Sequence, residues 1–260
     1  MKKGICIGSL PGDTADEKLA NAKRLGFDGV EVNTMTGPAR REEHRAASEK
    51  HGVAVSGVMN SAHWEHPLSD PDPVVRAKSL EGIAASIETA AALGADTVLI
   101  VPAVVNAGVT YEQAWERSAE SIREILPAAE EKNVILAVEN VWNKFLLSPV
   151  EFAAYVDSFE SKCLRAYFDA GNIVAYGYPD HWIRTLGKRI VKVHVKGFDA
   201  GQHAFVQLLA GTVDWPAVMN ALKDVGYDGY LTAEQAGEGK GPMKDLEKIS
   251  SDLDRILAMG

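Results

Sequence analysis

The chain has 260 residues, of which 46% are hydrophobic, and it carries a formal net charge of −9 at pH 7. This length and apolar fraction are typical of a globular protein with one large core. The acidic charge argues against a nucleic acid partner, because phosphate backbones are bound by clustered Lys and Arg, so a small-molecule ligand is the better prediction.

Cysteine content and the amino-terminal segment indicate a reducing compartment. The two cysteines, Cys6 and Cys163, each lie within or beside an apolar run, which favours two buried thiols over a disulfide or redox pair. The apolar run near Met1 is too short for a signal peptide and soon meets Pro11-Gly12. Since no other run reaches transmembrane length, we expect a cytoplasmic protein without membrane contact.

Apolar runs with strand character alternate with helical patterns along the chain. The first run, 4–10, ends at Pro11-Gly12, and Asp13 or Thr14 caps a helix that extends to Leu25. The later strands are predicted at 29–34, 53–59, 97–102, 134–141, 163–169, 190–196 and 229–235. Helices are predicted at 40–51, 74–93, 111–133, from Ser148-Pro149, around 182–186, at 214–225 and up to about residue 258.

This alternation predicts an α/β fold. Val, Ile and Leu run almost continuously through 97–101 and 134–138, as in a parallel sheet that is covered on both faces. An open, doubly wound sheet and a closed barrel both fit the pattern, but eight repeats in roughly 250 residues favour a (β/α)8 barrel. The sequence GSLPGD after the first strand is not the dinucleotide fingerprint GxGxxG. We therefore predict a (β/α)8 TIM barrel as one domain over residues 1–260.

Four polar residues lie at or near the ends of consecutive predicted strands, where a barrel places its active site. They are Glu139, Asp169, His194 and Glu234, on strands five to eight. Any one alone is typical of a strand-end charge facing water, but four on adjacent strands indicate one metal site. Oxygen and nitrogen donors suit Mn²⁺, the first expectation, or Co²⁺ or Mg²⁺, whereas the absence of thiolates argues against structural zinc.

Two members of this set, Glu139 and Glu234, could also move protons. Three strand steps of about 4.8 Å separate their strands, which would hold the two carboxylates on different sides of a ligand. Such a pair can remove a proton from one face of a carbon and return one to the other face. A metal chelated by a carbonyl and its neighbouring hydroxyl would stabilise the enediolate between the two steps.

Further residues are candidates for substrate binding. Lys196 lies two residues after His194 and would point to the same side of the strand, toward a substrate oxygen or a site carboxylate, unless it is simply solvated. In the long polar segment 60–73, His63 is a candidate for the pocket lining, although a lone loop histidine is more often exposed. Trp142 supplies either an apolar wall against a sugar or ordinary packing.

The glycine-rich segment AGEGKGPMKD, residues 236–245, follows the last strand. Barrels often bind phosphate there through backbone N–H groups, and Lys240 would add a positive charge. Glycines in a loop are weak evidence, so a phosphorylated substrate is the less favoured alternative.

Several segments together resemble the sugar phosphate isomerase/epimerase family, the xylose isomerase-like TIM barrels. They are VEN with Glu139, FDAGN with Asp169, KVHVKG with His194, the stretch from GTVDW to TAEQ with Glu234, and AALGADTVLI. The similarity covers nearly the whole chain, and the relatives include ketose 3-epimerases, L-ribulose-5-phosphate 3-epimerases and hydroxypyruvate isomerases. The resemblance implies that the four residues are metal ligands and that Glu139 and Glu234 are the acid/base pair.

One residue departs from the family pattern. Many members carry a histidine three residues after the strand-six aspartate, where it helps hold substrate hydroxyls, and this chain has Asn172 instead. Asn still forms hydrogen bonds with a hydroxyl but carries no charge, which leaves room for a different substrate. Association into dimers or tetramers fits the resemblance, but no stretch of sequence locates an interface.

Three functions are compatible with these residues. The first prediction is a divalent-metal-dependent isomerase or epimerase of a ketose or ketose phosphate, with proton transfer through a metal-bound enediolate. C3 epimerisation and aldose–ketose isomerisation share that intermediate, so the sequence does not separate them. The second function is a metal-dependent lyase or hydrolase acting on a keto-sugar glycoside, for which the 60–73 loop and Asn172 leave room. The third is a non-catalytic sugar-binding barrel, which has no need of both glutamates.

Overall fold

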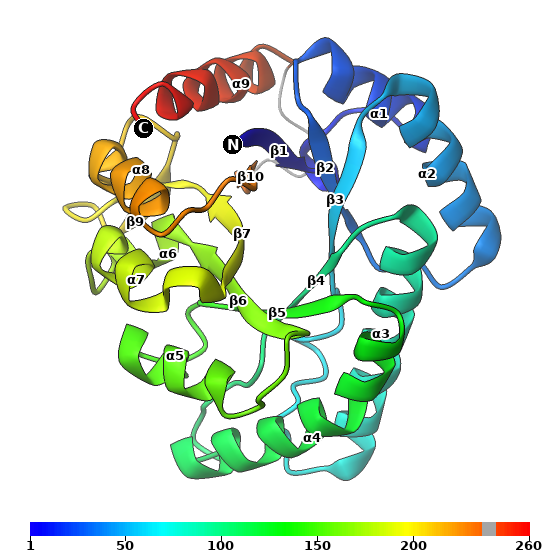
Figure 1. Cartoon of the computed structure of the whole chain (residues 1–260), viewed down its shortest axis with the longest axis vertical. Helices are drawn as coiled ribbons and strands as arrows, with labels where there is room; N and C mark the ends of the chain where they lie inside the picture. Colours follow the sequence, from blue (N-terminus) through cyan, green and yellow to red (C-terminus); the bar gives the residue numbers. More distant parts are fainter. Residues whose placement is uncertain (236–242) are drawn as a thin grey trace.

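A computed structural model of the chain describes residues 1–235 and 243–260. Eight parallel strands of the described residues close into a barrel in the order β1-β10-β7-β6-β5-β4-β3-β2, with the helices around it (Figure 1). The barrel strands are β1 (Lys2–Cys6), β2 (Gly29–Asn33), β3 (Ala54–Met59), β4 (Thr97–Ile100), β5 (Ile135–Glu139), β6 (Leu164–Asp169), β7 (Ile190–Val195) and β10 (Tyr230–Ala233). The fold class predicted from the sequence is confirmed.

Helices α1 to α8 connect successive barrel strands, and α9 follows the last strand, β10. They are α1 (Ala15–Arg24), α2 (Pro38–His51), α3 (Pro73–Leu93), α4 (Tyr111–Glu131), α5 (Pro149–Asp157), α6 (Ala170–Val174), α7 (Pro179–Leu186), α8 (Trp215–Asp224) and α9 (Met243–Leu257). Their ends follow from local chemistry. Thr14 accepts a hydrogen bond from the Glu17 backbone N–H in a capping box, and Gly94 ends α3 in the left-handed conformation at φ 71°.

The structure adds elements that the sequence pattern did not predict. A two-stranded antiparallel sheet, β8 (Gly197–Asp199) and β9 (Ala204–Val206), follows β7, and the short helix α6 follows β6 directly. The first barrel strand is also shorter than predicted, because residues Ile7–Ser9 form a 3₁₀ turn. The β8–β9 sheet and helix α6 both follow the carboxyl ends of barrel strands, so they shape the mouth where an active site is expected.

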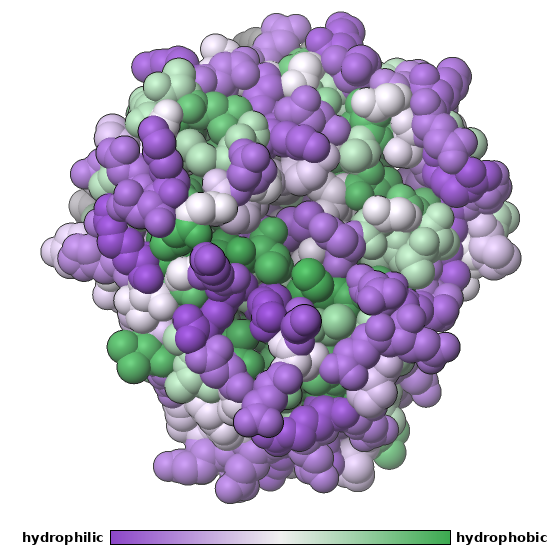
Figure 2. All heavy atoms as spheres, in the orientation of Figure 1, coloured by the Kyte–Doolittle hydropathy of each residue, from purple (hydrophilic) through white to green (hydrophobic). Residues whose placement is uncertain are grey.

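The core follows from the two-sided burial of the strands. All four residues of β4 are buried, and so are Leu136, Ala137 and Val138 of β5. Figure 2 shows hydrophilic residues over most of one face, with hydrophobic residues gathered near its middle. Both cysteines are free thiols, as expected; Cys6 is buried, but Cys163 is only partly buried, contrary to the prediction. Among the described helices, none is long and apolar enough to cross a membrane.

Candidate metal centre

The four strand-end residues meet at one point in the barrel mouth. Glu139, Asp169, His194 and Glu234 each offer a donor atom, and these atoms all lie within 4.8 Å of one another. Glu139 and Asp169 are the last residues of β5 and β6, His194 is the fifth residue of β7, and Glu234 follows β10. His194 Nδ1 lies 2.8 Å from Glu139 Oε1 and 3.5 Å from Glu234 Oε2.

The hydrogen bonding of two carboxylates fits a bound cation. Asp169 Oδ1 accepts the Asn172 backbone N–H at 2.6 Å. In contrast, Asp169 Oδ2 and Glu234 Oε2 are buried and accept no hydrogen bond from the described residues. A buried carboxylate oxygen without such a partner is costly, and a divalent ion is the partner that three carboxylates and an imidazole suit.

Lys196 carries the positive charge that faces these two oxygens. Its Nζ lies 3.1 Å from Asp169 Oδ2 and forms a second ion pair with Glu234, without hydrogen-bond geometry to either. Burial alone would lower the pKa of Lys196, but Asp169 and Glu234 raise it above its ordinary value. The ammonium therefore stays charged and holds the two carboxylates toward each other.

The two glutamates have pKa values that are moved in opposite directions. Burial raises the pKa of Glu139 to about 7. Burial would also raise the pKa of Glu234, but His194 and Lys196 outweigh it and hold that pKa below its ordinary value. The pKa of His194 is raised well above its usual range, since Glu31, Glu234 and Glu139 outweigh the effect of burial.

The variant Lys196→Met should destabilise the metal-free protein by about 3 kcal/mol, because it removes the cation that pairs with the buried Asp169 and the partly buried Glu234. A bound divalent ion would neutralise the same carboxylates, so the loss should shrink when Mn²⁺ is added. Thermal unfolding with chelator and with Mn²⁺ measures this difference. Lys192→Met is the matched control, because Lys192 pairs with Asp96 at 2.9 Å at the other end of the barrel and should respond equally in both conditions. An equal loss for Lys196→Met in both conditions would contradict the account.

Gly171 allows the turn after β6 to approach the end of β7. A Cβ atom at this position would lie 2.6 Å from Lys196 O and would collide with Lys196 Cγ. Gly171→Ala should therefore displace Lys196, cost about 1–3 kcal/mol of stability and weaken metal binding. Denaturant unfolding and metal titration measure both effects. Gly37→Ala is the control, because nothing lies within 4 Å of its added Cβ, and a similar loss there would refute the explanation.

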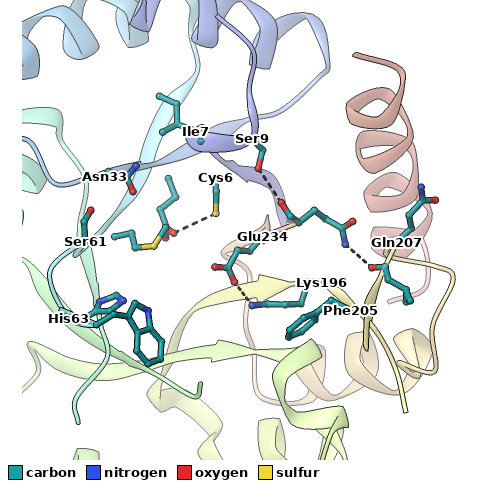
Figure 3. A pocket seen from close by; sticks show the side chains of 16 residues that line it. Cys6, Ile7, Ser9, Asn33, Ser61, His63, Lys196, Phe205, Gln207 and Glu234 are labelled. Atoms are coloured by element: carbon teal, nitrogen blue, oxygen red, sulfur yellow. Dashed lines mark hydrogen bonds and ion pairs between the residues drawn. The ribbon is translucent and has the colours of Figure 1, made fainter. Parts of the chain in front are cut away.

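A cavity of about 890 Å³ opens beside the metal centre. Glu31 lines the cavity. Figure 3 shows Glu234 and Lys196 in its lining, with Ser9, Asn33, Ser61 and Gln207 as neutral polar groups. Trp64 and Phe205 also line the cavity, and about half of each side chain is exposed. His63, from the loop after β3, lines the cavity and is buried, in contrast to the exposure that is more usual for a lone loop histidine; burial lowers its pKa to about 4 and keeps it neutral.

Two predicted substrate-binding residues, Asn172 and Trp142, contact residues next to the cavity. The described residues that line the cavity do not include Asn172 or Trp142. The Asn172 side chain donates to Asn140 O at 2.9 Å, and Trp142 Nε1 donates to Asn172 O at 2.9 Å. The Trp142 ring stacks on Phe205 at a centroid distance of 4.9 Å. Substrate binding by Asn172 and Trp142 therefore stays a prediction, and Lys240 lies outside the described residues.

Glu31 and Cys6 are two site residues that the sequence analysis missed. Cys6 Sγ, a Glu31 oxygen and a His194 nitrogen form a second group that meets within 4.8 Å. Burial raises the pKa of Cys6 to about 12, so the thiol stays protonated. The sequence does hold one signal for Glu31, because it is an acidic residue in the middle of the apolar strand GVEVN. A strand that is buried on both faces rarely carries a charged side chain.

Comparison with known proteins agrees with the fold. A family model described as xylose isomerase-like TIM barrel matches residues 19–257. The chain therefore belongs to the xylose isomerase-like TIM barrel family, as the sequence resemblance implied.

The similar proteins include several named as sugar epimerases. L-ribulose-5-phosphate 3-epimerase UlaE from Salmonella typhi is 30% identical over 262 residues, which cover 94% of this chain and 91% of that protein. A D-tagatose 3-epimerase-like protein superimposes with a TM-score of 0.86 at 19% identity, over 100% of this chain and 98% of the other. D-psicose 3-epimerase with D-tagatose from Clostridium cellulolyticum H10 gives 0.82 at 20% identity, over 100% and 99%. These two structural likenesses establish the fold.

Proposed function

We propose that the protein is a divalent-metal-dependent epimerase of a ketose or ketose phosphate, which acts at the carbon next to the carbonyl. The observation that carries this proposal is the meeting of Glu139 and Glu234 with Asp169 and His194 at the barrel mouth. A binding protein has no need of two carboxylates at the same point, whereas an epimerase needs one proton acceptor and one proton donor.

Glu139, Asp169, His194 and Glu234 would hold the metal ion, since each offers one donor atom to the same space. When bound, a Mn²⁺, Co²⁺ or Mg²⁺ ion would act as a Lewis acid that stabilises negative charge on a sugar oxygen. Lys196 keeps Asp169 and Glu234 in place through its two ion pairs.

The two glutamates perform the proton transfers. One carboxylate takes the proton from the substrate carbon, and the electron pair of that C–H bond moves toward the carbonyl to give an enediolate. The other glutamate, in its protonated form, returns a proton to the opposite face of the same carbon. Because the strands β5 and β10 are separated by β6 and β7, the two carboxylates approach the substrate from different directions.

The cavity and the relatives support a sugar substrate. Ser9, Asn33, Ser61 and Gln207 offer neutral hydrogen-bonding groups for hydroxyls, and the rings of Trp64 and Phe205 suit the C–H faces of a sugar. The relative named L-ribulose-5-phosphate 3-epimerase UlaE, at 30% identity, favours a ketose or ketose phosphate whose configuration is inverted at carbon 3. Among the described residues that line the cavity, Lys196 is the cationic side chain, and it forms an ion pair with Glu234 of the metal centre.

Incubation with a panel of ketoses and ketose phosphates tests the proposal. The panel contains D-tagatose, D-psicose, L-ribulose and L-ribulose 5-phosphate, each with Mn²⁺ and with a chelator. We expect at least one member to be converted to its C3 epimer in the presence of Mn²⁺ and not with the chelator. Absence of any epimer, or equal conversion with the chelator, would count against the proposed function.

A further inference from the structure

Glu31 is a buried carboxylate beside the metal centre that the proposed reaction does not use. It lies in the middle of β2 and is 2% exposed. Its Oε1 lies 3.0 Å from His194 Nε2, and its Oε2 accepts the Tyr167 hydroxyl at 2.6 Å. Both oxygens therefore have hydrogen-bonding partners, whereas Asp169 Oδ2 and Glu234 Oε2 accept no hydrogen bond from the described residues and face the Lys196 ammonium instead.

His194 lies between Glu31 and the candidate ligands. Its Nδ1 faces Glu139 and Glu234, while its Nε2 faces Glu31. An imidazole nitrogen that binds a metal must be unprotonated, so the ring proton has to stay on the other nitrogen. A carboxylate that accepts this N–H fixes the tautomer and the orientation of the ring, and it makes the ligating nitrogen more basic.

The surroundings of Glu31 hold the carboxylate in this position. Gly57 on β3 leaves room for it, because an added Cβ there would lie 3.3 Å from Glu31 Oε2. The Tyr167 ring packs against the His194 ring at a centroid distance of 4.4 Å, so the residue that donates to Glu31 also contacts the histidine. The Cys6 thiol lies 3.8 Å from Glu31 Oε1 as a further weak donor.

We propose that Glu31 is a positioning residue of the metal centre, which fixes the His194 tautomer with Nδ1 directed at the metal, and that Tyr167 holds Glu31 in place. This inference rests on the metal dependence in the proposed function. It assigns no second metal ion to Cys6, Glu31 and His194, because both oxygens of Glu31 already accept hydrogen bonds.

Metal affinity measured on the metal-free protein tests the assignment without any substrate. Calorimetric titration with Mn²⁺ should give a Kd about 10–100-fold higher for Glu31→Leu than for the native protein. Glu31→Gln should lose less, because its amide oxygen still accepts the Nε2–H, and Tyr167→Phe should also lose less than Glu31→Leu. Ser56→Ala is the control, since it removes a buried hydrogen bond to Val30 O on the same strand pair and should keep the native Kd.

A spectroscopic measurement separates positioning from a loss of folding. In the Mg²⁺-loaded native protein, long-range ¹H–¹⁵N correlation should place the His194 proton on Nε2, and Glu31→Leu should no longer fix it there. If Glu31→Leu folds and keeps both the native Kd and the native His194 tautomer, the role of Glu31 is overturned while the proposed metal dependence stands. If the native protein binds no Mn²⁺, both this inference and the proposed metal dependence are overturned. Should Glu31→Leu not fold, a native Kd in Tyr167→Phe overturns the assignment of Tyr167 and Glu31 as a positioning pair.

Discussion

Replacing Glu234 by Gln should lower the rate of epimerisation by about 10³-fold at saturating Mn²⁺, because the variant lacks a carboxylate that exchanges a proton with the substrate carbon. Gln keeps the size of the side chain and an oxygen that can still face the metal, so the loss is expected mainly in kcat. Steady-state kinetics with the best ketose of the panel measures it.

The control for this variant is Glu49→Gln. Glu49 is an exposed residue on the outer helix α2, where it pairs with Arg45, and its substitution should leave the rate unchanged. The account also requires Glu139→Gln to lose activity to a similar extent, because each direction of the reaction needs both groups. A Glu234→Gln variant with more than a tenth of the native rate would show that this carboxylate moves no proton.

Replacing Asp169 by Asn should lower the affinity for Mn²⁺ by at least about 100-fold, so that no tightly bound metal remains. This loss exceeds the one that is typical when a residue that only supports a metal ligand is replaced. Asn keeps the size of the side chain and can still accept the Asn172 N–H through its oxygen, as Asp169 Oδ1 does at 2.6 Å. An amide NH₂ replaces Oδ2, which removes both a candidate metal ligand and the partner of the Lys196 ion pair. Metal analysis after gel filtration and Mn²⁺ titration measure the result.

Asp96→Asn provides the comparison for Asp169→Asn. Asp96 also pairs with a buried lysine, Lys192, but at the other end of the barrel, so its loss should lower stability without changing metal content. If Asp169→Asn keeps one equivalent of tightly bound metal, Asp169 is not a ligand and the metal centre is assigned wrongly.

The barrel and the convergence of four residues could be predicted because strand ends in a parallel barrel share one face. Each of Glu139, Asp169 and His194 ends an apolar run, so the order of strands alone brings them together. Glu31 could not be placed in the same way, because its partners Tyr167 and His194 lie 136 and 163 residues away in the chain. Its contacts depend on barrel closure between β1 and β10, which a linear pattern does not show.

The residues around the cavity mouth were also beyond the sequence pattern. The β8–β9 hairpin brings Phe205 to the cavity and places Trp142 against its outer side, where the indole donates to Asn172 O. Such loop packing depends on tertiary contacts rather than on hydrophobic periodicity. His63 could be proposed from its long loop, but its burial is a property of the folded mouth.

In the proposed reaction, Glu139 and Glu234 exchange a proton with the carbon next to the carbonyl of a ketose. Incubation of the ketose in D₂O with Mn²⁺, followed by NMR of both epimers, tests it most directly. The account predicts deuterium at that carbon with the native protein, and none with the double variant Glu139→Gln, Glu234→Gln or with chelator. Epimerisation without deuterium at that carbon, or equal exchange in the double variant, would contradict it.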